Sequence, residues 1–104
     1  MEDLKNLKLS LERKIAEASG VVIVPHNGID FDAIASAFAV ALIAKKYKKQ
    51  HYIVVNDPVY KIDHGVQLII DDAKKDFNII NKDKYLQYKN QNDLIILLML
   101  IKTI

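Results

Sequence analysis

The stretch that decides the fold runs from residue 21 to residue 37 and reads VVIVPHNGIDFDAIASA. It opens with four β-branched residues closed by Pro25, a run typical of a parallel strand buried on both faces. A segment of seven residues that contains one histidine and two aspartates follows, at positions 26–32. Residues 32–47 are then rich in alanine and predict a helix. A strand, a short loop and a helix in this order form the first half of a βαβ unit.

The rest of the chain continues this alternation. Apolar residues at three- and four-residue steps predict a helix over residues 4–18, ended by Gly20. We further predict strands at 52–55 and 94–98 and helices at about 63–75 and about 82–88. The apolar run 94–101 is far shorter than the about 20 residues of a membrane-spanning helix, so no membrane segment is expected. The pattern predicts an α/β fold with a parallel, three-layer sheet.

Composition limits the functional classes. The 104 residues fit a single small domain, and a hydrophobic fraction of 51% favours a folded chain over a disordered one. The 15 basic and 13 acidic residues are too balanced to indicate binding to duplex nucleic acid or an anionic membrane. The absence of cysteine excludes disulfides and thiolate-bound zinc. Together with an N-terminus that lacks a signal-peptide core, it leads us to expect a cytoplasmic protein.

The loop after the first strand carries the candidate chemistry. In open α/β sheets ligands bind beyond the carboxyl ends of the strands, and here His26, Asp30 and Asp32 lie at that place. Imidazole and carboxylate are ligands for Mn, Fe or Zn, and two such ions can clamp a phosphate group. A structural alternative is a capped loop, with Asp32 at a helix N-terminus, where Asp is favoured. The residues alone leave both interpretations open.

The whole of residues 21–37 closely resembles the first motif of the DHH phosphoesterases, which is strand, His, three residues, Asp, one residue, Asp and a helix of small residues. Residues 52–56 and 79–80 look most like the DHH domain of cyclic-di-AMP phosphodiesterases. The resemblance extends from about residue 10 to about residue 98. It implies that residues 1–104 form one truncated domain, the N-terminal part of a parallel DHH phosphoesterase domain.

The resemblance also implies roles for single residues. His26 and Asp30 would hold one Mn²⁺ ion and Asp32 a second, with no catalytic or cofactor-binding residue beyond these ligands. Ser36, one helical turn after Asp32, would pack near the ligands rather than bind metal. The implied activity is metal-dependent hydrolysis of a phosphodiester, with cyclic di-AMP as the nucleotide substrate. Alternatives are an oligoribonuclease- or exopolyphosphatase-type enzyme, and a non-catalytic α/β remnant or binding module.

The chain departs from the family pattern near residue 99. The family has there a second Asp that bridges both ions, whereas this chain has Met99, whose thioether is a poor ligand for hard ions. No Asp-His-His motif occurs in the 104 residues. The two-metal site is therefore incomplete, enzymatic activity is open, and we expect this chain alone to be inactive. We also expect the apolar strand 94–98 to form an unprotected edge that promotes self-association.

The last residues suggest a hypothesis about the gene. Residues 99–103 read MLIKT, which is what Asp-Val-Asn-Lys-Asn becomes when its codons are read one nucleotide later. The restored Asp would stand at the second metal position of the family. We therefore hypothesise a frameshifted or prematurely ended gene, which a downstream out-of-frame stretch encoding Asp-His-His would support.

Three further groups of residues have simpler interpretations. His51, beside a lysine cluster, is expected to be solvated. The five tyrosines are scattered along the sequence and predict no stacking platform for bases (Tyr47, Tyr52, Tyr60, Tyr85 and Tyr88). Asp63, His64 and Gly65 come too early to be the Asp-His-His motif, and they are expected to form a helix N-cap.

Overall fold

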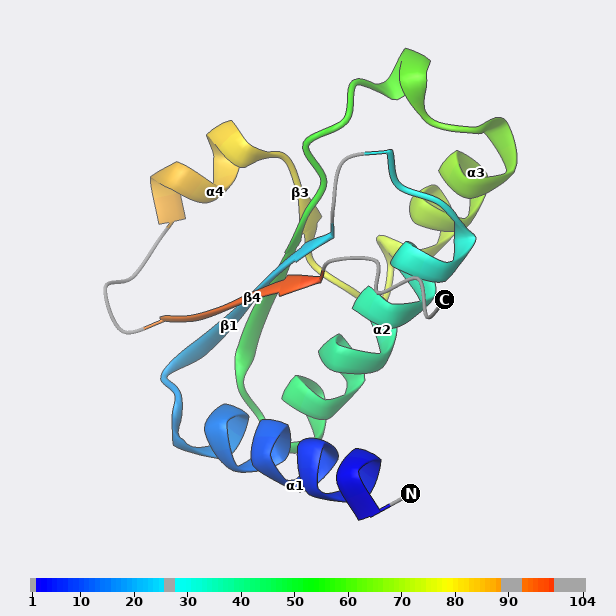
Figure 1. Cartoon of the computed structure of the whole chain (residues 1–104). Coiled ribbons are helices and arrows are strands. Elements are labelled where there is room, and N and C mark those ends of the chain that lie inside the picture. The colour runs from blue at the N-terminus through cyan, green and yellow to red at the C-terminus, as the bar shows by residue number, and fades with distance from the viewer. Residues whose placement is uncertain (1, 26–27, 89–92, 99–104) are drawn as a thin grey trace.

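Strands and helices alternate along the chain, as the computed structural model in Figure 1 shows for residues 2–25, 28–88 and 93–98. The elements are α1 (Glu2–Glu17), β1 (Gly20–Pro25), α2 (Phe31–Lys46), β2 (Gln50–Val54), the 3₁₀ turn η1 (Val59–Lys61), α3 (His64–Ala73), β3 (Ile79–Ile80), α4 (Lys82–Tyr88) and β4 (Asp93–Leu98). Within the described residues the strands form one sheet in the order β3-β2-β1-β4, and every pairing is parallel. The prediction of an α/β fold is confirmed.

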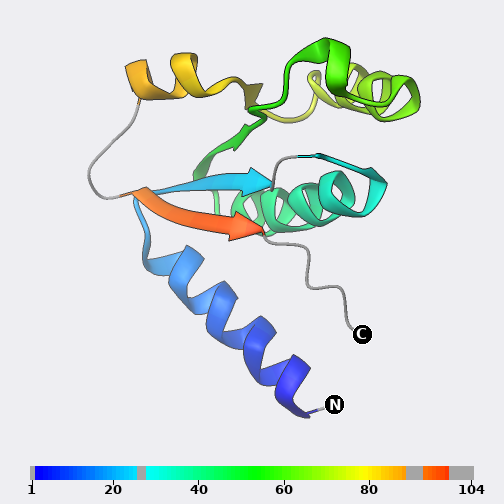
Figure 2. The same cartoon turned by 45° about the horizontal axis from the view of Figure 1, so that its top comes forward.

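Strand β1 is one of the two central strands of the sheet. β1 pairs with β4 from Gly20–Asp93 to Pro25–Leu98, and with β2 from Gly20–Gln50 to Ile23–Ile53. Figure 2 shows the arrows of β1 and β4 side by side and pointing the same way. Among the described residues β4 pairs with β1 alone, so it is an edge strand as the sequence predicted. The loop after β1 therefore begins in the middle of the sheet.

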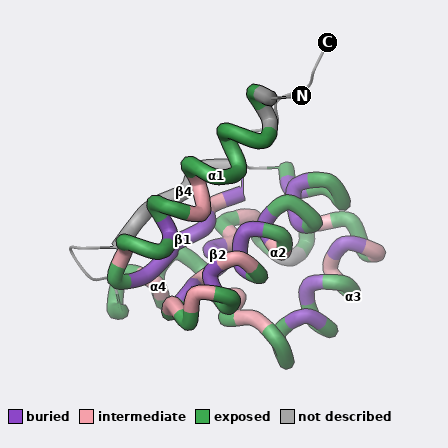
Figure 3. The backbone as a smooth tube through the Cα atoms, turned by 90° about the horizontal axis from the view of Figure 1, so that it is seen from below, coloured by how far each residue is buried: buried purple, intermediate pink, exposed green. Residues whose placement is uncertain are grey.

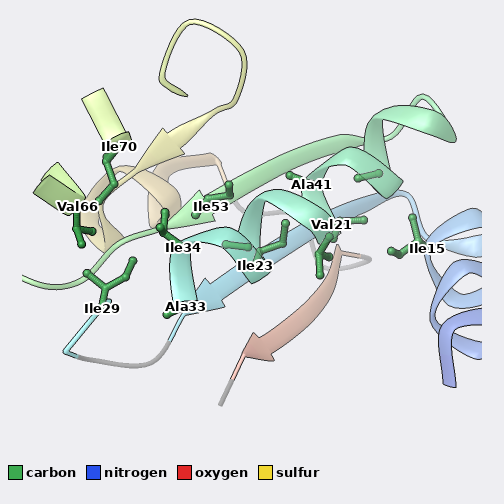
Figure 4. Close-up of a cluster of buried hydrophobic side chains, with 13 residues drawn as sticks. Ile15, Val21, Ile23, Ile29, Ala33, Ile34, Ala41, Ile53, Val66 and Ile70 are labelled. Carbon is green, nitrogen blue, oxygen red and sulfur yellow. The ribbon is translucent and has the colours of Figure 1, made fainter. Parts of the chain in front are cut away.

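Helix α2 covers one face of this sheet. Its buried side chains are mostly alanines, whose small size lets the helix approach the strands closely (Ala33, Ala37, Ala41 and Ala44). Opposite them lie Val21, Ile23 and Ile53, all at most 1% exposed. Figure 4 shows this cluster continuing to Ile15 of α1 at one end and to α3 at the other. Figure 3 shows the buried class gathered on β1 and α2, whereas α1 is exposed along most of its length.

A short helix lies against the opposite face of β2. Side chains alternate along a strand, so Tyr52 points away from the α2 side on which Ile53 is buried. Its ring stacks on Tyr88 at 6.1 Å between centroids and meets Tyr85 at 6.3 Å. Both partners belong to α4. Three tyrosines that are far apart in the sequence are therefore brought together, because helix α4 folds back over the strand that carries Tyr52.

Element boundaries differ from the predicted ones by a few residues. The first helix ends at Glu17, and Gly20 is already the first residue of β1. Strand β2 begins at Gln50 because the register with β1 extends the ladder to that residue. The two-residue strand β3 pairs with the end of β2, and the helix at 82–88 is confirmed.

Asp63 caps α3 as predicted, since its Oδ2 accepts from Gly65 N at 3.0 Å.

His51 is buried, which corrects the prediction that it is solvated. Because β2 starts at Gln50, His51 stands inside the ladder opposite Val21 and is only 6% exposed. Its ring meets the ring of Phe77 edge-on, with 5.9 Å between centroids. Burial first, and the nearby Lys45 charge second, lower the pKa of His51, against a backbone hydrogen bond with Lys49 that raises it. Within the described chain, Nε2 of His51 has no hydrogen-bond partner.

Candidate functional site

The loop between β1 and α2 passes through a backbone conformation that favours glycine. Gly28 has a φ of +76°, in the left-handed region where an L side chain is strained. A Cβ built at this position would meet no atom within 4 Å, so the requirement for glycine is one of backbone shape rather than of space. Residues 26 and 27, and with them the predicted ligand His26, lie outside the described residues.

A carboxylate from the neighbouring strand holds this loop. Oδ2 of Asp57 accepts hydrogen bonds from Gly28 N and from Ile29 N, each at 2.9 Å. Asp57 stands three residues after the end of β2, so the bonds join the segments that follow the two central strands. A charged acceptor that binds two backbone N–H groups makes bonds roughly twice as strong as neutral ones. We call this arrangement the Asp57 clamp.

An apolar side chain fastens the same loop from the inside. Ile29 is only 6% exposed and belongs to the core cluster. Figure 4 shows its side chain in the same cluster as Val66 and Ile70 of α3 and Ile34 of α2. Asp57 holds the backbone N–H groups of Gly28 and Ile29, and the buried side chain of Ile29 holds the same segment from the core. The segment between Gly28 and the start of α2 is therefore fixed on two sides.

The two predicted carboxylate ligands have different positions at the start of α2. Asp30 is the N-cap of the helix, and its Oδ1 accepts from Ala33 N at 2.8 Å. Asp32 is an exposed residue in the first turn, where its negative charge interacts favourably with the positive end of the helix dipole. The capping role that the structural alternative gave to Asp32 therefore belongs to Asp30. Ser36, which was expected to pack near the ligands, is exposed on α2.

Asp30 and Asp32 have suitable chemistry for a divalent metal, but the described residues supply too few ligands. Asp30 and Asp32 are both exposed, and carboxylate oxygens suit hard ions such as Mn²⁺ and Mg²⁺. Across the described ranges, however, no group of three or more His, Cys, Asp or Glu side chains is placed to hold an ion. His26 and Met99 both fall outside those ranges. The structure thus places two of the three predicted ligands at the start of α2, and the third lies outside the described residues.

Comparison with known proteins gives no relative from which to carry over a function. Neither the protein-family models nor the curated proteins contain a match to this chain. Within the described part of the chain, none of the helices is both long and apolar enough to cross a bilayer.

Sequence reasoning missed Asp57. In the sequence, Asn56-Asp57-Pro58 indicates only a turn that ends the predicted strand 52–55. The signal that would have found it is topological, because the carboxyl ends of adjacent parallel strands meet at one edge of the sheet. A carboxylate just after β2 is therefore within reach of the loop after β1. Its specific partners, the N–H groups of Gly28 and Ile29, follow from the left-handed turn at Gly28.

Proposed function

We propose that the loop from His26 to Asp32 is the divalent-metal loop of a DHH-type phosphodiesterase domain, and that the ancestral substrate is a cyclic dinucleotide, cyclic di-AMP. The observation that carries the proposal is the position of Asp30 and Asp32. Both are exposed at the carboxyl end of the central strand, where ligands of parallel α/β sheets bind. The lack of cysteine supports a cytoplasmic setting.

The residues of this chain would contribute binding and orientation. His26, Asp30 and Asp32 would hold the ions, and the Asp57 clamp would keep their backbone in place. Bound Mn²⁺ would supply Lewis acidity for hydrolysis of a phosphodiester. With Met99 at the second Asp position and no Asp-His-His sequence, the 104-residue polypeptide would lack about half of the ligands. We therefore expect no hydrolysis of cyclic di-AMP by this polypeptide in the presence of Mn²⁺, and measurable turnover would contradict that expectation.

Metal binding is tested by titrating the protein with Mn²⁺ and following the electron paramagnetic resonance signal of the free ion. Asp30→Asn is the informative variant, because Asn caps helices about as well as Asp and keeps an oxygen for Ala33 N. We expect Asp30→Asn and Asp32→Asn each to weaken Mn²⁺ binding by about tenfold or more. Asp72→Asn, an exposed carboxylate on α3, is the control and should bind as the wild type does.

A second candidate function is a small α/β binding module whose acidic loop is structural. The observation that favours it is the capping bond of Asp30, which gives this carboxylate a role without any metal. In that case Mn²⁺ titrations of wild type, Asp30→Asn and Asp32→Asn would coincide. An oligoribonuclease- or exopolyphosphatase-type substrate would replace cyclic di-AMP if the metal-loaded protein binds oligoribonucleotides or polyphosphate but does not bind cyclic di-AMP.

A further inference from the structure

A cavity of about 280 Å³ opens beside the Asp57 clamp, between α3 and the carboxyl ends of β2 and β3. In Figure 1, α3 lies on one side of β3 and α4 on the other. Its apolar lining comes from five aliphatic side chains (Val55, Ile62, Ile70, Ile79 and Ile80). Small-molecule sites have volumes of roughly 300–1,000 Å³, so this cavity lies just below the lower end of that range and suits a ligand smaller than a dinucleotide.

The charged lining favours an anion. The lining includes two lysines, Lys74 and Lys84, and one acidic residue, Asp57. Oδ2 of Asp57 already binds two N–H groups of the neighbouring loop, which offsets part of its negative charge. Lys74 lies 3.4 Å from Asp71, but both side chains are about half exposed, and such pairs are weak. Both ammonium groups are therefore available to an anionic ligand such as a phosphate ester.

Two amide side chains, Gln67 and Asn81, also line the cavity. Nε2 of Gln67 donates to Asp71 Oδ1 at 2.8 Å, and its Oε1 is buried without a partner among the described residues. Because this Oε1 has no surface that a water-sized atom can reach, the amide that a ligand in the cavity can meet is that of Asn81, an exposed residue. Amide side chains of this kind can pair with the edge of a purine base.

We propose that this cavity binds a nucleoside monophosphate, with its base against the aliphatic lining and Asn81 and its phosphate near Lys74 and Lys84. These features point to one ligand chemistry, since a flat ring with polar edges and a phosphate monoester occur together in that class. The proposal does not depend on the metal loop, because none of His26, Asp30 and Asp32 lines the cavity. It assigns the chain a binding activity separate from hydrolysis.

The test is a titration of ¹⁵N-labelled protein in EDTA, followed by the amide signals of Ile70 and Ile79. The probes are AMP, adenosine and inorganic phosphate. We expect AMP to shift both signals and to bind about tenfold more tightly than either adenosine or phosphate alone. Shifts with phosphate alone at equal affinity, or no shift with AMP at millimolar concentration, would overturn the proposal. Removing divalent ions keeps this result separate from the outcome of the Mn²⁺ experiment.

A pair of matched double variants tests the charged groups. Lys74→Gln combined with Lys84→Gln is expected to weaken AMP binding by about tenfold. The control combines Lys48→Gln with Lys75→Gln, which removes the same charge from lysines outside the cavity and should stay within about twofold of the wild type. These lysines are exposed, so the amide spectra of both double variants should remain those of the folded chain. Equal loss in the two double variants would contradict the proposal, because it would indicate only a response to net charge.

Discussion

Asp57 and His51 lie at opposite ends of β2, and they show two ways in which this small fold treats a polar side chain. Asp57, beyond the carboxyl end, binds two backbone N–H groups at 2.9 Å. His51, near the amino end, is 6% exposed and leaves Nε2 without a partner in the described chain. A satisfied carboxylate organises a loop, whereas an imidazole with one unpaired nitrogen makes the core sensitive to protons. The difference locates the candidate site at one end of the sheet and a stability liability at the other.

The largest effect is expected from removing the apolar anchor of the candidate loop. Ile29→Ala takes a side chain that is 6% exposed out of the core, and we expect the free energy of unfolding to fall by about 3 kcal/mol. Urea denaturation followed by circular dichroism measures it. The matched control is Ile69→Ala, because Ile69 on α3 is 38% exposed and should cost clearly less. Equal losses would mean that the loop is held by the Asp57 clamp alone.

A smaller effect is expected from breaking the Asp57 clamp itself. Asp57→Ala leaves the N–H groups of Gly28 and Ile29 without their acceptor, and we expect a loss of about 2 kcal/mol. Asp57→Asn keeps an acceptor oxygen without the charge and should lose about half as much. Hydrogen exchange gives the specific readout, since exchange at Gly28 and Ile29 should accelerate more than exchange in α1. Unchanged exchange at these two amides would show that the clamp does not hold the loop in solution.

The sequence predicted the elements better than it predicted the contacts between them. Periodicity identified β1, α2 and the short helix α4, because each carries its own apolar or small-residue pattern. It also predicted the N-cap at Asp63, which depends on residues close in the sequence. It missed the Asp57 clamp, whose partners are 28 and 29 residues apart along the chain. Such contacts depend on strand order and register, which a single local pattern does not contain.

The error at His51 has the same origin. A histidine beside lysines is usually solvated, and the predicted strand began one residue after it. Pairing with Val21 extends β2 to include His51, and the alternation of side chains then turns the ring toward Phe77. The contact between Tyr52 of β2 and Tyr88 of α4 was missed for the same reason, since the two rings become neighbours only when α4 folds back over β2. Polar residues at strand ends are therefore the positions where local reasoning fails first.

The smallest expected effect is a pH dependence of stability that originates at His51. Burial and the Lys45 charge lower the pKa of this imidazole below its ordinary value of 6.5. The unfolded chain therefore takes up the proton at a higher pH than the folded chain does, and stability falls as the pH drops below about 6.5. Urea midpoints measured between pH 8 and about pH 5 should show this decline for the wild type and a flatter profile for His51→Leu. His64→Gln, which removes an exposed histidine, is the control and should keep the wild-type slope. If His51→Leu kept the wild-type slope as well, the proton taken up on unfolding would bind to another group. His51 would then make no contribution to the pH dependence of stability.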